Sequence, residues 1–223
     1  RPPLRRIQRP LGTAYVRRVR LRFRLLIAFR LNVDFITGEP GGHNFLQPSL
    51  IRGLVEELQG TIVECNTAYA GRRNTTGEHW KAIAEHGFLD IAPCDIMDED
   101  GELSIPVNGG KHLTENFVGA HLQRYDSMLL LSHFKGHAMG GFGGALKNMS
   151  IGVASAHGKA HIHGVGVPEN LWTADHDSFL ECMAEADKAF RELDYEVFTA
   201  LCKLLEDFDK IKIAYGKGDK TNV

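Results

Sequence analysis

Residues 129–152 read LLLSHFKGHAMGGFGGALKNMSIG, and this stretch decides the expected fold. The leucine run is typical of a buried strand, and Ala145, Leu146 and Lys147 are suited to begin a helix. Between them lie four glycines in five positions, a density that costs folding entropy. Such a connection predicts either a close approach of the backbone to a ligand or a turn that has no room for a Cβ.

Basic side chains flank these glycines. His133, Lys135 and His137 precede them, and Lys147 follows. The stretch has neither the spacing of a P-loop nor the acidic residue about 20 positions on that a dinucleotide fingerprint requires. It therefore predicts a site for an anionic ligand or a metal at the carboxyl end of a strand. The alternative is a tight, closely packed connection without a ligand.

Outward from this stretch, apolar runs alternate with helical patterns. Strands are expected at 32–37, 61–66 and 127–133, and the helix from Pro48 would bury Leu50, Leu54, Val55 and Leu58. Further predictions are a helix within 74–87, a β excursion at 98–113, a short helix at 115–122 and a last helix at 177–190. This order predicts a three-layer α/β domain over 32–190, with a largely parallel sheet and helices on both faces.

The two ends of the chain differ in composition from this domain. Residues 1–31 contain ten arginines and no acidic residue, although the whole chain has 28 acidic residues. This segment could be a basic arm for nucleic acid or lipid, a transit peptide, or sequence outside the fold. We favour a basic extension that lies outside the core, and we do not expect nucleic acid to be a partner. Residues 191–223 are expected to form a helical tail.

Two glycine-rich loops, 37–44 and 136–147, would open at the same edge of a parallel sheet. The second strand would bring Glu64, Cys65, Asn66 and Thr67 to that edge. Backbone groups of the two loops are the expected cofactor-binding atoms, at Gly41, Gly42, His43, Asn44, Gly140, Gly141, Gly143 and Gly144. Proton transfer or charge would come from the candidate catalytic residues His133, Lys135, His137 and Lys147.

Six of the eleven histidines lie between residues 133 and 176. Imidazole is the commonest nitrogen ligand of transition metals, so His133, His137, His161 and His163 are the candidate metal ligands. His161 and His163 would face the same side if their segment is extended. The alternative for each is a surface or hydrogen-bonded histidine. The acidic run from Asp95 to Glu102 is interpreted as a solvated turn, because it lacks calcium-loop spacing.

The four cysteines, Cys65, Cys94, Cys182 and Cys202, stand singly in the sequence. None belongs to a Cys-x-x-Cys motif, so spacing indicates neither a zinc ribbon nor a ferredoxin-type cluster. Reduced thiols in the cytoplasm are expected. No apolar span is long enough for a transmembrane helix, so no membrane association is predicted.

Several longer motifs are specific enough to suggest a family. They are TGEPGGHNFLQP (37–48), GTIVECNTAYAGRRNTT (60–76), DIMDEDGE (95–102), LSHFKGHAMGGFGGALKNMSIGVAS (131–155) and GKAHIHG (158–164). From about residue 37 to residue 189 the chain resembles the prokaryotic domain-of-unknown-function family three-six-two (DUF362), truncated at its C-terminal end. The resemblance implies an iron–sulfur-associated protein with a ferredoxin-type redox partner, although the family's cysteine motif is absent here.

A second resemblance concerns only the glycine-rich loop. Its order of strand, His, Gly-Phe-Gly-Gly and Lys is similar to a loop of lactate-racemase-type enzymes, which use a nickel pincer nucleotide tethered to a lysine. That similarity implies Lys147 or Lys135 as a tether, with His133, His137 or His161 nearby. Three functions therefore remain open. They are an iron–sulfur-linked protein that binds an anion or metal cofactor, an enzyme acting on a small anionic substrate, and an inactive binding module.

Overall fold

The computed structural model describes residues 25–29, 45–125, 127–131, 135–137, 141–193 and 196–199. Its centre is a five-stranded sheet in the order β3-β2-β1-β6-β9, in which every neighbouring pair is parallel. The strands are β1 (Leu25–Phe29), β2 (Thr61–Glu64), β3 (Cys94–Ile96), β6 (Ser127–Leu131) and β9 (Glu196–Thr199). The expected parallel α/β sheet is thus confirmed.

Two helices make the crossovers at the beginning of the sheet. Helix α2 (Pro48–Leu58) lies between β1 and β2, and α3 (Thr76–Glu85) lies between β2 and β3. Pro48 stands in the first turn of α2, where its missing N–H costs no hydrogen bond. The buried face of α2 is Ile51, Val55 and Leu58, whereas Leu50, expected inside, is exposed. The apolar pattern therefore predicted the helix correctly, but the face that is buried is shifted by about one residue from the predicted face.

Between β3 and β6 the chain forms an antiparallel hairpin of β4 (Glu102–Pro106) and β5 (Glu115–Gly119). The expected β excursion is therefore present. The short helix expected at 115–122 was wrong for its first part, because residues 115–119 pair with β4. Only Ala120–Arg124 is helical, as a 3₁₀ helix.

After β6 comes a second hairpin, β7 (Lys135–His137) with β8 (Gly141–Gly143). Helix α4 (Ala145–Lys147) follows and continues as a π-helical segment, Asn148–Gly152. Helix α5 (Ala156–His163) and the long helix α6 (His176–Arg191) complete the part before β9. Part of the glycine-rich stretch is thus a β-hairpin, where small residues let two strands meet closely.

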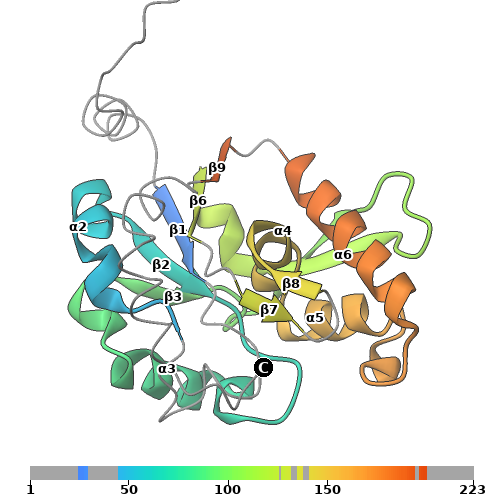
Figure 1. The fold of residues 1–223 in the computed structure, drawn as a ribbon, viewed down its shortest axis with the longest axis horizontal. Helices are drawn as coiled ribbons and strands as arrows, with labels where there is room; N and C mark the ends of the chain where they lie inside the picture. The colour runs from blue at the N-terminus through green and yellow to red at the C-terminus, as the bar shows by residue number, and fades with distance from the viewer. Residues whose placement is uncertain are drawn as a thin grey trace, which may run out of the picture.

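Alternate residues of the strands pack on opposite faces of the sheet. Ile62, Leu129 and Leu131 join a hydrophobic cluster with α2 and α3. Val63 and Met128 join a second, larger cluster with α5, α6 and the β4–β5 hairpin. Figure 1 shows the helices divided in the same way, with α2 and α3 on one side of the sheet and α5 and α6 on the other. Both faces therefore carry a core, while the three-layer arrangement itself stays a prediction.

The ends of the chain differ from the expectation. Leu25–Phe29, assigned to the basic extension, forms β1 between β2 and β6. A short apolar run fits such a strand, since both its neighbours are parallel strands. Glu196–Thr199, assigned to a helical tail, pairs with β6 instead. The strand expected at 32–37 lies outside the described residues.

No helix in the described part of the chain combines the length and the apolar character that a membrane crossing requires.

Candidate functional site

A buried polar cluster lies where strand β2 ends. Glu64 is the last residue of β2, and His79 on helix α3 is fully buried against it, with 2.8 Å between His79 Nε2 and Glu64 Oε2. The other ring nitrogen, Nδ1, lies 3.1 Å from Asn66 Oδ1. The Asn66 amide nitrogen donates to Thr76 Oγ1, which leaves the amide oxygen to face the ring. Oxygen atoms therefore face both ring nitrogens of His79.

Arg73 brings a positive charge to the same cluster. It lies in a short 3₁₀ helix, Arg72–Asn74, and its Nη1 is 3.5 Å from Glu64 Oε2. The side chain is almost completely buried. Its backbone carbonyl accepts a hydrogen bond from Thr67 N, which closes the loop between Thr67 and Arg73. We call Glu64, Asn66, Arg73 and His79 the carboxyl-edge cluster.

Lys159 reaches the cluster from helix α5 on the other side of the sheet. Its ammonium donates to the carbonyl oxygens of Asn66, at 2.8 Å, and Ala154, at 2.6 Å. The residue is only 3% exposed. Asp98, after strand β3, accepts from the backbone N–H groups of Asn66 and Ala156. The ends of β2 and β3 and the start of α5 are therefore held together at one edge of the sheet.

Lys147, one of the candidate catalytic residues, is also buried, with 4% of its surface exposed. It precedes the π-helical segment that leads to Val153 and Ala154. Val153 accepts a hydrogen bond from the Cys65 thiol, so this segment ends at the carboxyl edge of β2.

The remaining glycine-loop residues are only partly described. The backbone register of the β7–β8 hairpin places Lys135 opposite Gly143 and His137 opposite Gly141. Gly144 follows the hairpin, and its carbonyl accepts from Asn148 N. The other candidates lie outside the described residues, namely Gly41, Gly42, His43, Asn44, His133 and Gly140. Whether the two glycine loops face each other therefore stays a prediction.

His161 and His163 do not alternate on an extended segment, because both lie on helix α5. Residues two apart on a helix point in different directions. His163 Nδ1 lies 2.7 Å from the Lys159 carbonyl oxygen, and its ring stacks on Phe179. His161 packs edge-on against Phe117, and burial lowers the pKa of its imidazole. The two rings thus have separate surroundings, and their role as metal ligands stays a prediction.

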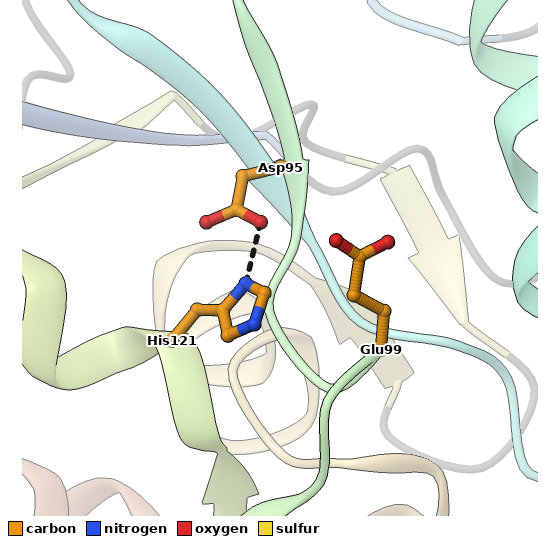
Figure 2. Close-up of side chains that lie close together, drawn as sticks. All are labelled: Asp95, Glu99 and His121. Atoms are coloured by element: carbon orange, nitrogen blue, oxygen red, sulfur yellow. Dashed lines mark hydrogen bonds and ion pairs between the residues drawn. The ribbon is translucent and has the colours of Figure 1, made fainter.

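One group of side chains has the composition of a metal site. Ligand atoms of Asp95, Glu99 and His121 lie within 4.8 Å of one another, and Figure 2 shows the three side chains converging. His121 Nδ1, however, is 2.7 Å from Asp95 Oδ1, and its Nε2 is 2.8 Å from Asp100 Oδ2. Trp80 Nε1 donates to Glu99. A metal ion would have to displace these hydrogen bonds.

The charge of His121 also favours hydrogen bonding over metal ligation. Burial alone would lower the pKa of its imidazole, but the hydrogen bonds to Asp95 and Asp100 outweigh burial and raise the pKa. A protonated imidazole has no lone pair for a metal. We interpret the group as an ion-pair network that joins β3 to the 3₁₀ helix before β6. Sequence reasoning missed His121, because its partners lie more than 20 positions away in the chain.

The described cysteines are free thiols in three separate elements. Cys65 follows β2, Cys94 begins β3 and Cys182 lies on α6. Burial raises the pKa of the Cys65 thiol, and it raises those of Cys94 and Cys182 to about 12. Cys202 lies outside the described residues. A cluster needs thiolates, so these environments do not favour iron–sulfur ligation.

The parallel sheet, with buried polar groups gathered at its carboxyl edge, defines an α/β domain. The chain belongs to the family described as Domain of unknown function (DUF362), which matches residues 27–213. This match confirms the family that the sequence motifs indicated.

Comparison with solved structures gives a weaker similarity. The lactate racemase apoprotein from Thermoanaerobacterium thermosaccharolyticum superposes with a TM-score of 0.47 at 15% sequence identity. The match covers 80% of this chain but 44% of that one, so the chain spans less than half the length of that structure. Among curated proteins there is no match.

Proposed function

We propose that this chain is a three-layer α/β domain that binds a small anionic ligand at the carboxyl edge of its parallel sheet. The observation that carries the proposal is the buried ammonium of Lys159, which donates to the carbonyl oxygen of Asn66, two residues after the end of β2. Interactions between charges are strong away from water, so an anionic ligand at this edge would be attracted to this buried cation.

Two further cations support an anion rather than a bare metal ion. Arg73 is buried in the carboxyl-edge cluster, and Lys147 is buried at the start of the helical segment that ends there. A metal cation near these buried positive groups would be repelled, since Coulomb interactions are strong away from water. Glu64 provides the negative group that pairs with Arg73 and His79.

Iron–sulfur association is the second candidate, and it is implied only by the resemblance of the sequence motifs to other members of the family. Burial raises the pKa of each described cysteine thiol, which disfavours the thiolate form that a cluster ligand requires. A ferredoxin-type redox partner and an enzymatic role on a small anionic substrate both stay proposals. For either role, anion binding at the carboxyl edge would be the first step.

The test is a thermal-shift and calorimetric titration with phosphate, pyrophosphate and acetate at constant ionic strength. The parent is compared with Lys147→Met and Lys159→Met, with far-UV circular dichroism verifying that each variant is folded. Lys81→Met is the matched control, because Lys81 is exposed on α3. Charge-assisted hydrogen bonds are the strong ones, so each buried-lysine variant should bind about tenfold more weakly or worse.

Two results would overturn the proposal. One is that none of the anions stabilises the parent more than chloride does at the same ionic strength. The other is that both buried-lysine variants bind as tightly as the parent and as Lys81→Met.

A further inference from the structure

An aromatic pair lies beside the carboxyl-edge cluster. Tyr69 belongs to the loop after β2, and Trp172 belongs to the turn before α6. Their ring centroids are 5.8 Å apart, with 51° between the ring planes. Trp172 is 63% exposed, the largest exposed fraction among the large hydrophobic side chains of the described residues. Most tryptophans are largely buried, so an indole held open to solvent marks a contact surface.

The position of Tyr69 links this pair to the buried cations. Tyr69 lies within the loop that Thr67 N and the Arg73 carbonyl close at 2.9 Å, and its own carbonyl accepts from Thr67 Oγ1. Asn66, whose carbonyl holds the Lys159 ammonium, is only three residues earlier. The Cα atoms of Asn66 and Tyr69 can therefore be no more than about 11 Å apart. This loop therefore carries Tyr69 of the aromatic pair together with Arg73 and with Asn66, the residue whose carbonyl oxygen accepts from Lys159.

We propose that the ligand of this edge carries a planar aromatic ring next to its anionic group, and that the ring stacks on Trp172 beside Tyr69. This inference rests on the proposed anion site and adds the ligand class, of which a nucleoside monophosphate is an example. The tilted contact with Tyr69 holds the Trp172 indole in place. The indole is therefore already positioned before the ligand ring stacks on it. Stacking on an aromatic side chain accepts many planar rings, and charge at the edge selects those that bear an anion.

The experiment uses two pairs of probes that differ in the ring. Adenosine 5′-monophosphate is compared with ribose 5-phosphate, and benzoate is compared with acetate, by calorimetry on the full chain. Trp80→Phe leaves Trp172 as the single tryptophan, because the chain has two. In this background the ring-bearing probe should quench the emission of Trp172. In at least one pair, the ring-bearing probe should bind about tenfold or more tightly than the probe without the ring.

Substitutions in the protein test the contribution of the ligand ring to affinity separately from that of its anionic group. Trp172→Ala should remove the advantage of the ring-bearing probe while the affinity for inorganic phosphate is unchanged. Tyr69→Ala should reduce that advantage in part. Leu50→Ala is the control, because Leu50 is an exposed apolar residue on α2. It should leave every affinity as in the parent.

The outcomes distinguish this inference from the proposed function. If the anions bind and the ring adds nothing in either pair, the aromatic site is wrong and the anion site stands. If no anion binds at all, both fail. Light scattering at the assay concentration provides the remaining test. A dimer that Trp172→Ala dissociates would assign the indole to an interface between copies and overturn the ligand proposal.

Discussion

The ammonium nitrogen of Lys159 lies 2.8 Å from the carbonyl oxygen of Asn66, which joins helix α5 to the end of strand β2. The same ammonium bonds the Ala154 carbonyl just before α5. One buried cation therefore holds together two segments that are 93 positions apart in the chain. Both of these acceptors are backbone carbonyl oxygens.

Replacing Lys159 should consequently lower stability as well as anion affinity. Lys159→Met leaves two buried carbonyl oxygens without this donor, which should cost about 1–3 kcal/mol of unfolding free energy. Lys81→Met, at an exposed position, should change it by less than about 0.5 kcal/mol. Urea denaturation of the two variants checks this. Equal effects would show that the Lys159 contacts contribute nothing.

Two helical glycines should respond in opposite directions to alanine. A Cβ at Gly158, on α5, would lie 2.0 Å from the Phe117 carbonyl oxygen, so Gly158→Ala should cost about 1–3 kcal/mol. Gly77, on α3, has nothing within 4 Å of an added Cβ, so Gly77→Ala should stabilise by about 0.5–1 kcal/mol. Thermal and urea denaturation measure both. A Gly158→Ala variant as stable as the parent would mean that α5 does not pack closely on β5.

The His121 network should make stability depend on pH in one direction. The raised pKa of His121 means that the folded state binds the proton more tightly than the unfolded state, whose value is near 6.5. The contribution of this group is therefore complete below about pH 6.5 and is lost as pH rises through the folded-state pKa. His121→Gln should lose more unfolding free energy at about pH 5.5 than at about pH 8.5. The same loss at both values would contradict the network.

His86 should act in the opposite direction. Its ring stacks on Phe45 at 4.3 Å, and neither ring nitrogen has a hydrogen-bond partner among the described residues. Burial, and then the charge of Arg73, lower the pKa of this imidazole below 6.5. The unfolded state therefore takes up the proton first, and stability falls as pH drops below about 6.5.

His86→Phe keeps a ring against Phe45 and removes the titrating group. The variant should lose less stability than the parent between about pH 7 and about pH 5, as measured by urea denaturation at several pH values. If His86→Phe showed the same acid dependence as the parent, the lowered pKa would be wrong.

Local pattern was sufficient for the parts of the fold that local physics controls. Pro48 and the apolar spacing predicted α2, and the apolar run before Glu64 predicted β2. Residues 115–119 were misread as helical because their partner is β4, and such a pairing is invisible in a short window. The condition under which His161 and His163 would face the same side, an extended segment, is not met, because both lie on α5. Ser155 caps the start of α5 by accepting from Gly158 N.

For the candidate site, the sequence by itself determined which residues stand at the strand end. Glu64 and Asn66 follow an apolar run, so their arrival at the carboxyl edge follows from the parallel order of the sheet. Tertiary structure alone decided that His79, Lys159 and Asp98 meet them there, because those contacts depend on how α3, α5 and β3 pack on the ends of the strands. Burial, and hence the energetic weight of each charge, is likewise a property of packing, which sequence spacing does not record.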